Sequence, residues 1–236
     1  MLHCRLVDYI WYNYLYIIFI LLVKKETIVA FDFDGTLTTK DTLIEFIAFT
    51  KGRWRLYGGF LLFSPLLIAM RLKLLPNWKV KQWLFSYFFK NTPIEIFDKW
   101  GTEFSTIVDQ MLCPKMMEVL QSHKNKDDSV VIVSASIENW IKPWATKMGI
   151  NTVIATQIET DLEHQITGKF LTKNCYGQEK VNRLLERFPN RNDYHLIAYG
   201  DSCGDREMIK FAEHGVHLLD AGNIDITIKK LPLNIQ

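Results

Sequence analysis

The chain has 236 residues, of which 48% are hydrophobic, so it is long enough to bury a substantial core. Its 28 Lys and Arg residues against 26 Asp and Glu leave a formal net charge of +2, which gives no support to a nucleic-acid partner. The absence of a C-x-x-C pair or regular cysteine spacing favours reduced thiols and a cytoplasmic location; the cysteines are Cys4, Cys113, Cys175 and Cys203.

Residues 1–25 form an apolar segment that precedes everything else. Tyr9 to Val23 is nearly continuous apolar and aromatic sequence, and Lys24 and Lys25 follow it. A signal peptide is disfavoured, because the positive charge follows the apolar run and no small-residue cleavage site is present. Two interpretations stay open: a membrane anchor with both lysines on the cytoplasmic side, or a start site placed upstream of the true one.

A short apolar run from Thr27 to Phe31 is typical of a buried strand, and Asp32-Phe33-Asp34-Gly35-Thr36 follows it. Residues i and i+2 of a strand point to the same side, so Asp32 and Asp34 can face one pocket. One carboxylate can attack phosphorus while the other protonates a leaving oxygen and then activates water. Gly35 permits a tight turn beside a bound phosphate. The structural alternative is an Asp-x-Asp-Gly turn after an edge strand.

The next ninety residues read mostly as helices. Asp41 is placed to cap a helix that starts at Thr42, and Thr92 is predicted to cap another, with Pro93 at its first position. Residues 46–94 contain eight basic side chains, twelve aromatic ones and no Asp or Glu. Two interpretations stay open: residues 51–81 contact an anionic membrane surface, or they form a helical lid that packs on itself with solvated lysines.

Polar groups follow the next predicted strand, Val130 to Val133. Ser134-Ala135 places a hydroxyl and backbone N–H groups at its carboxyl end, where an anion can bind. Ser136 is suited to cap the helix that follows. Farther on, Val153 to Thr172 is predicted to form a hairpin that turns at Thr167-Gly168.

Two more polar groups complete the pattern. Lys180 lies early in a helix-like stretch, and the apolar run Leu196 to Tyr199 leads into the carboxylates Asp201 and Asp205. A parallel sheet gathers its strand ends at one edge, and ligands bind there. Carboxylates and a main-chain carbonyl suit Mg²⁺. We interpret Cys203 as a small filler, because no histidine or second cysteine lies near it in sequence.

These elements, in this order, resemble the haloacid dehalogenase-like hydrolase superfamily, and in detail its phosphoserine-phosphatase-like branch, subfamily IB. The match covers residues 27 to about 220. The resemblance implies an α/β fold, a Rossmann-like parallel sheet with helices on both faces. It also implies a catalytic core of residues 26–40 and 126–236, with a helical cap of residues 41–125 inserted between the first and second motifs.

The same resemblance implies a role for each site residue. Asp32 is the expected nucleophile and Asp34 the acid and base. Phosphate ligands are expected at Gly35, Thr36, Ser134, Ala135 and Lys180, with Asp41 as a substrate contact. The expected cofactor is Mg²⁺, bound by Asp32, the carbonyl of Asp34, Asp201 and, directly or through water, Asp205.

The predicted activity is hydrolysis of a phosphomonoester through an aspartyl-phosphate intermediate. The cap is similar to that of the C-type phosphatidylglycerophosphate phosphatases, which implies a lipid phosphate at the inner face of a membrane. Phosphoserine or another small metabolite is the rival substrate, although phosphoserine phosphatases carry Glu where this chain has Asp41. A non-enzymatic phospho-accepting signalling module is disfavoured, because its acceptor Asp lies mid-chain and it lacks a cap.

Overall fold

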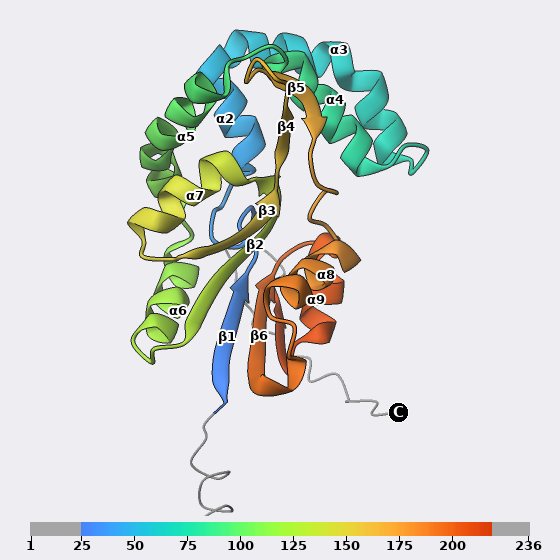
Figure 1. Ribbon diagram of the computed structural model, residues 1–236. Helices are drawn as coiled ribbons and strands as arrows, with labels where there is room; N and C mark the ends of the chain where they lie inside the picture. Colours follow the sequence, from blue (N-terminus) through green and yellow to red (C-terminus); the bar gives the residue numbers. More distant parts are fainter. Residues whose placement is uncertain (1–24, 219–236) are drawn as a thin grey trace, which may run out of the picture.

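The computed structural model describes residues 25–218 (Figure 1). The apolar segment predicted at the amino terminus, and with it the choice between anchor and upstream start, therefore lies outside the described residues apart from Lys25.

A parallel sheet of five strands forms the centre of the molecule, in the order β3-β2-β1-β6-β7. The strands are β1 (Glu26–Phe31), β2 (Ser129–Ile137), β3 (Thr152–Thr156), β6 (Tyr194–Gly200) and β7 (His214–His217). The central strand β1 pairs with β2 on one side and with β6 on the other. The predicted Rossmann-like α/β fold is confirmed.

Helices cover both faces of the sheet, because β1 is apolar at every position from Ile28 to Phe31. Val29 and Phe31 point to one face, where they pack with the buried residues of α6 and α7. Ile28 and Ala30 point to the other face, toward α8 and α9. These four helices are α6 (Pro114–Lys124), α7 (Glu138–Lys147), α8 (Gln178–Arg187) and α9 (Arg206–Phe211).

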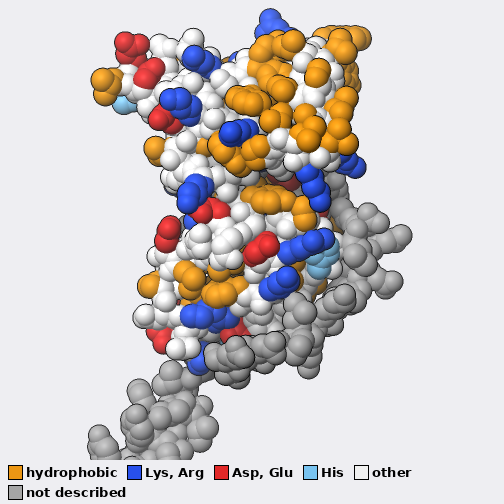
Figure 2. Space-filling model, turned by 90° about the vertical axis from the view of Figure 1, so that its right-hand side faces the viewer, with side chains coloured by type: hydrophobic (Ala, Val, Ile, Leu, Met, Phe, Trp, Pro, Cys, Tyr) orange, Lys and Arg blue, Asp and Glu red, His pale blue; other side chains and the backbone are white. Residues whose placement is uncertain are grey.

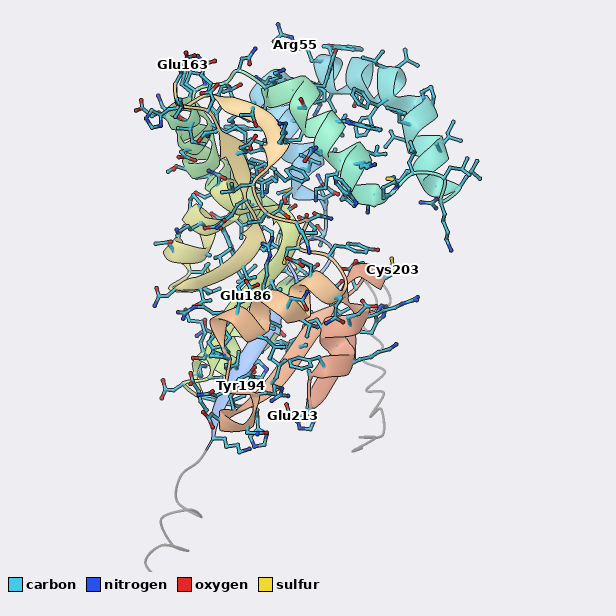
Figure 3. The ribbon with its side chains drawn as sticks, turned by 45° about the vertical axis from the view of Figure 1, so that its right-hand side comes forward. Arg55, Glu163, Glu186, Tyr194, Cys203 and Glu213 are labelled. Atoms are coloured by element: carbon cyan, nitrogen blue, oxygen red, sulfur yellow. The ribbon has the colours of Figure 1, made fainter. Side chains whose placement is uncertain are left out.

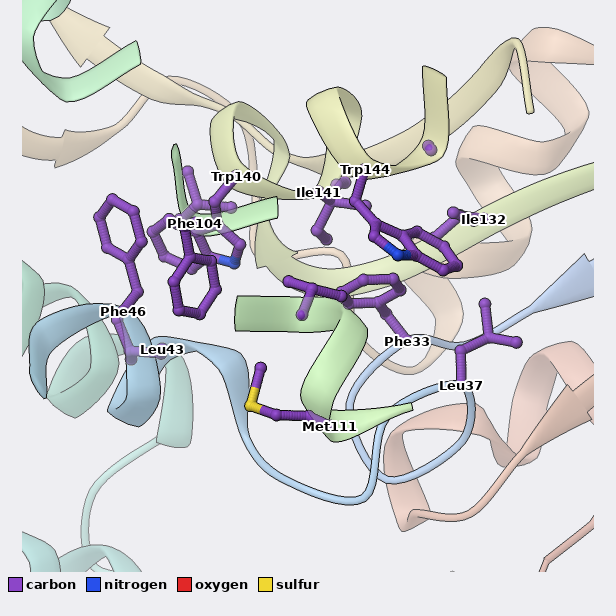
Figure 4. Packing of buried hydrophobic residues seen from close by; sticks show 14 of the residues in the cluster. Phe33, Leu37, Leu43, Phe46, Phe104, Met111, Ile132, Trp140, Ile141 and Trp144 are labelled. Carbon is purple, nitrogen blue, oxygen red and sulfur yellow. The ribbon is translucent and has the colours of Figure 1, made fainter. Parts of the chain in front are cut away.

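Four helices inserted between β1 and β2 form the cap. They are α2 (Thr42–Lys51), α3 (Arg53–Arg71), α4 (Asn77–Phe89) and α5 (Ile94–Val108), followed by the short 3₁₀ helix η1 (Asp109–Met111). Phe46 of α2 lies at the centre of their contact, with its ring 5.2 Å from Phe104 and 4.6 Å from Trp140 of α7 (Figure 4). The cap is therefore packed onto the core through one shared aromatic cluster.

The boundary predicted at residue 125 grouped α6 with the cap. In the structure α6 lies along β2 of the sheet, away from α3 and α4 (Figure 1). A helix that directly precedes a strand of a parallel sheet packs back onto that sheet, which explains its position.

The predicted hairpin exists, but its turn was placed wrongly. β4 (Ile158–Thr160) and β5 (Ile166–Phe170) pair antiparallel, and residues 161–165 connect them. The side chain of Asp161 closes this turn by accepting hydrogen bonds from the backbone N–H groups of Glu163 and Gln165. The hairpin extends over the cap, where the Phe170 ring lies 5.7 Å from that of Phe85 on α4.

One helix start was confirmed and one was wrong. Asp41 caps α2, and its Oδ1 accepts from the N–H groups of Leu43 at 2.9 Å and Ile44 at 3.2 Å. α5 begins one residue later than predicted, with Pro93 at the cap position and no side-chain cap. The carbonyl of Thr92 is engaged by Ile166 of the hairpin, a long-range contact that holds Thr92 outside the helix.

Candidate active site

The carboxyl ends of β1 and β6 bring three acidic side chains together. Asp32 follows β1 directly, whereas Asp201 and Asp205 follow β6, and their carboxylate oxygens lie within 4.8 Å of one another. Because neighbouring parallel strands end at the same edge, residues 169 positions apart meet there, as the sequence predicted. Such a cluster of oxygen ligands is the kind that a hard divalent cation prefers.

Lys180 is the cation at the centre of this cluster. It lies in the first turn of α8, and only 1% of its surface is exposed. Its ammonium donates to Oδ1 of Asp32 and Oδ1 of Asp205, both at 2.5 Å, and to the carbonyl of Val133 at 2.7 Å. All three ammonium hydrogens are thus used within the protein, and Lys180 is not a solvated lysine.

The charges of the cluster do not balance within the protein. Three ionised carboxylates and one ammonium leave two negative charges. Burial raises the pKa of Asp32 to about 8, against the opposing effect of Lys180, and Asp205 adds repulsion. Burial alone would lower the pKa of Lys180, yet Asp32 and Asp205 raise it above its ordinary value. A divalent cation among the carboxylates would cancel the remaining charge and favour their ionised forms.

Asp205 and Asp201 are held differently. Both oxygens of Asp205 already have protein donors, Lys180 at Oδ1 and the backbone N–H and hydroxyl of Ser202 at Oδ2. Asp201 Oδ1 accepts from the hydroxyl of Thr36, at 3.2 Å, and the Asp201 carboxylate also has a hydrogen bond from its own backbone N–H. Burial, and then Asp205, raise the pKa of Asp201. Asp201 therefore keeps more acceptor capacity for a metal than Asp205 does.

Gly35 fits the turn that the sequence predicted. Its φ is +82°, and a Cβ on it would lie 2.3 Å from Oδ2 of Asp201. Any other residue would combine a strained backbone with an overlap on a carboxylate of the cluster. Glycine is thus required here by the close approach of the two loops.

Asp34 lies at the end of a chain of hydrogen bonds. Its Oδ1 accepts from the Thr42 N–H at 2.9 Å, and its Oδ2 accepts from the Ser136 hydroxyl. The Thr42 hydroxyl donates to Ser136 at 3.2 Å, and the Trp140 indole donates to Thr42 at 3.0 Å. Since an indole N–H can only donate, every bond in this chain points toward Asp34.

The protonation of Asp34 is tuned by its surroundings. Burial, followed by repulsion from Asp41, raises the pKa of Asp34 to about 6, although Lys81 and the hydrogen bond from Ser136 lower it. A carboxyl group with that pKa can hold or release a proton near neutral pH. This is the property required of a group that serves first as an acid and then as a base.

Ser136 corrects a sequence prediction. It was predicted to cap a helix, but it lies within β2, and Ile137 occupies the cap position of α7. Ser134 and Ser136 are two positions apart, and the Ser134 hydroxyl accepts from the Ser136 N–H at 3.1 Å. The i and i+2 rule that paired Asp32 with Asp34 would also have found Ser136.

A lysine from the cap reaches the same end of β2. Lys81 of α4 donates to the carbonyl of Ala135 at 3.0 Å, a contact that sequence reasoning missed because it treated Lys81 only as part of a basic stretch. Lys81 and Ala135 border a cavity of about 250 Å³ between cap and core. Most of its lining is apolar and comes from the cap: Leu43, Ile44, Phe60, Leu67, Met70, Val80 and Leu84, with Asp41, Asn77, Asn174 and Tyr176 as polar groups.

Cys203 was predicted to be a small filler, and this is wrong. Its side chain is exposed at the start of the 3₁₀ helix η3 (Cys203–Asp205), where Sγ lies 2.8 Å from the Tyr176 hydroxyl (Figure 3). The tight turn that buries Asp205 turns Cys203 outward. Within residues 25–218 no cysteine forms a disulfide bond.

Three clustered carboxylates, a buried ammonium and two serine hydroxyls thus meet at the carboxyl edge of a parallel sheet. The family model described as haloacid dehalogenase-like hydrolase matches residues 29–210. The chain belongs to this family, and it is an enzyme of the phosphatase kind. The alternative of a non-enzymatic signalling module is thereby set aside.

Named relatives agree with this assignment. The chain is 33% identical over 192 residues to Protein CicA of Caulobacter vibrioides, which covers 80% of this chain and 84% of that protein. It is 26% identical over 125 residues to a histidinol-phosphatase of Neisseria meningitidis, covering 50% of this chain and 54% of that protein. A phosphoserine phosphatase structure with a phospho-aspartyl intermediate analogue superposes with a TM-score of 0.55 at 20% identity, covering 83% and 86% of the two chains, and shows a shared fold.

Proposed function

We propose that this protein is a Mg²⁺-dependent phosphomonoesterase that forms an aspartyl-phosphate on Asp32. The observation that carries the proposal is the buried contact of Asp32 with Lys180 beside Asp201 and Asp205. An anionic nucleophile can approach an anionic phosphate only where positive charge compensates both. Lys180 supplies part of that positive charge, and the carboxylate cluster has the oxygen ligands to bind a divalent cation that supplies the remainder.

In the first half of the reaction, an Asp32 oxygen forms a bond to phosphorus and the bond from phosphorus to the alcohol oxygen breaks. Asp34 gives its proton to that leaving oxygen. In the second half, Asp34 takes a proton from water as the water oxygen bonds to phosphorus and the bond to Asp32 breaks. The Ser134 hydroxyl holds a phosphoryl oxygen in both halves, while the charge of Lys180 neutralises Asp32; Lys180 binds a phosphoryl oxygen only when its ammonium releases one of its three protein acceptors.

Mg²⁺ fits the donors that surround Asp32. Asp32, Asp201 and the Asp34 carbonyl would hold it, and Mg²⁺ would neutralise charge on the phosphoryl oxygens. Asp205 would contact it through water, because Lys180 and Ser202 already occupy both of its oxygens.

For the substrate we propose a phosphate ester of an amphiphilic alcohol, such as the lipid phosphatidylglycerophosphate, hydrolysed at the cytoplasmic face of a membrane. The cavity beside Ala135 is mostly apolar, which suits such an alcohol better than the ammonium and carboxylate of phosphoserine. Asp41, at the position that would contact phosphoserine, already accepts two backbone N–H groups of α2.

The mechanism is tested with Asp32→Asn, which removes the anionic nucleophile at nearly constant volume. We expect phosphate release to fall by at least about three orders of magnitude, and acid-stable labelling by ³²P-substrate to vanish. Asp193→Asn, an exposed residue far from the cluster, is the matched control and should keep full activity. Full activity of Asp32→Asn would refute the mechanism.

The substrate is tested separately by comparing phosphatidylglycerophosphate in mixed micelles with phosphoserine and histidinol phosphate. We expect the highest kcat/KM for the lipid. Higher kcat/KM for either soluble ester would refute the substrate proposal but leave the mechanism at Asp32 intact.

A further inference from the structure

Helix α3 is apolar around most of its circumference, yet only one side of it packs on the protein. On the inner side Leu56 is buried, and Gly59 lies so close to α4 that a Cβ would meet the Phe88 ring at 2.4 Å. The outer side carries a stripe of exposed residues spaced three or four apart, which places them in one line along the helix. This outer stripe consists of Trp54, Tyr57, Leu61, Pro65, Ile68 and Leu72.

The outer stripe is exposed to an unusual degree. Trp54 retains 88% of its surface and Leu61 retains 77%. Figure 2 shows apolar side chains gathered over this part of the molecule, with basic side chains around them. Further exposed apolar residues on and around α3 and α4 extend the patch: Leu62, Leu74, Trp78, Trp83 and Tyr87. A continuous apolar surface of this kind marks a contact with another body.

Positive charge borders the stripe at both ends of α3. Arg53 and Arg55 lie at its start, and Arg71 and Lys73 lie at its end. Asp and Glu are absent from residues 46–94, so no acidic side chain of these helices neutralises them. Apolar and aromatic residues flanked by cations are the composition of a helix that lies in the interface of an anionic bilayer.

The structure does not favour a helix that crosses the membrane. Within residues 25–218 no helix is long and apolar enough to span a bilayer. The inner side of α3 already packs on α4, through the contact between Gly59 and Phe88. Of the two sides of α3, the outer one is exposed and available for lipid.

We infer that the protein docks on anionic membranes through the outer stripe of α3, with the helix parallel to the surface and its apolar side chains immersed. This inference deepens the proposed function, whose substrate lies at a membrane face, but it stands on the residues of α3 alone, because the chemistry at Asp32 does not require it. The basic residues at the two helix ends then contact lipid phosphates at two separated points, which fixes the long axis of α3 in the membrane plane.

A second copy of the chain is a poorer occupant of the same surface. Both ends of α3 are positive, so two copies packed stripe to stripe bring like charges together in either the parallel or the antiparallel arrangement. No acidic side chain of residues 46–94 is present to relieve that repulsion. An anionic lipid surface, in contrast, satisfies all four cations at once.

The docked orientation also explains how α3 relates to the cleft. Its outer side faces lipid, while Phe60, Leu67 and Met70 on its inner side line the cavity that contains Lys81. In this orientation α3 therefore lies between the bilayer and that cavity.

Co-sedimentation of the full chain with vesicles tests the docking. We expect binding to vesicles of phosphatidylcholine with phosphatidylglycerol, weaker binding to phosphatidylcholine alone, and weakening by salt. Trp54→Ser with Leu61→Ser removes apolar contacts of the stripe, and Arg53→Gln with Arg71→Gln removes charge from both ends. The charge variant should bind about five-fold more weakly per neutralised side chain at low salt.

A matched control lies on the opposite side of the cap, near Glu163 (Figure 3). Leu162 is fully exposed there, and the Leu162→Ser variant should bind vesicles as the unaltered protein does. Hydrolysis of a soluble ester, p-nitrophenyl phosphate, should be unchanged in every variant, which separates failure of docking from failure of the proposed function. Equal binding of the stripe variants and the unaltered protein, or a dimer in solution that Leu61→Ser dissociates, would overturn the inference.

Discussion

The hydroxyl of Ser136 gives Asp34 a fixed orientation, because the hydrogen bonds behind it run in a single direction from Trp140 through Thr42. Thr42, Ser136 and Trp140 are all buried, so water does not compete for the bonds between them. Positioning of this kind costs no reorganisation when the proton moves.

Ser136→Ala should slow turnover by about tenfold, since Asp34 loses one of its two orienting donors. The hydrogen bond from Ser136 lowers the pKa of Asp34, so its loss should raise that pKa. We expect the Asp34 limb of the pH profile of kcat to move to higher pH. Ser105→Ala, a buried hydroxyl in α5, is the control and should leave the profile unchanged. A limb that stays in place in Ser136→Ala would show that Ser136 does not act through Asp34.

Lys180→Met should destabilise the fold by about 3–5 kcal/mol at neutral pH, because it leaves Asp32 and Asp205 buried without their cation. Urea unfolding measures this loss, with the exposed Lys99→Met as control. Metal-free protein should be used, since a divalent cation would replace part of the missing charge. A loss no larger than that of the control would mean that the carboxylates are solvated in solution.

At the level of the elements, the hairpin of β4 and β5 is fixed to the cap through Gly168. This residue has φ at +86°, and a Cβ on it would lie 2.3 Å from Oγ and 3.1 Å from Cα of Ser86 on α4. Backbone conformation and contact both require glycine there. The hairpin therefore cannot shift along α4 without losing this fit.

Gly168→Ala should cost about 1–3 kcal/mol of stability through backbone strain and displacement of α4. Gly58→Ala is the matched control, because a Cβ at this helical position meets nothing within 4 Å and alanine favours a helix. We expect the two substitutions to change the urea midpoint in opposite directions. A neutral Gly168→Ala would indicate that the hairpin is not held against α4.

Some boundaries of the helices and strands could be predicted from the sequence, and others could not. The strand ends at Asp32 and Asp201, and the helix cap at Asp41, follow from local patterns, and these were predicted correctly. The start of α5 and the turn of the hairpin were predicted wrongly. Thr92 is held outside its helix by Ile166, which lies more than seventy residues away in the chain. Lys81 was missed for the same reason, since its contact with Ala135 depends on how the cap folds over the core. Long-range contacts override local propensity at these points.

At the scale of the whole molecule, Glu213 lies at the end of the sheet opposite the carboxylate cluster, where it joins the residue before β7 to the start of β6. It accepts from the Arg191 guanidinium and from the Leu196 N–H at 2.8 Å, close to Tyr194 at the start of β6 (Figure 3). Burial would raise the pKa of Glu213, but these donors hold it below its usual value of 4.5. A lowered pKa means that folding stabilises the charged form.

The resulting stability should be complete above the usual pKa of Glu213 and should be lost as the pH falls through its lower value in the folded state. Glu213→Gln should therefore destabilise the protein at neutral pH, and the difference from the unaltered protein should shrink in acid. Urea unfolding at neutral and at acid pH measures the difference in stability, with Glu186→Gln, at an exposed position, as the control. A difference that stays constant with pH would mean that the charge of Glu213 contributes nothing.

The central position of β1 has a consequence for the synthesis of the protein. β1 emerges early, but its partner β6 begins 163 residues after β1 ends. At about 5–20 residues per second, the ribosome needs on the order of ten seconds or more to supply that strand. Until then one edge of β1 has no neighbour in the sheet, and Asp32 does not have Asp201 beside it. A nascent chain that stalls before β6 is consequently both catalytically inert and open to pairing with other unfolded chains.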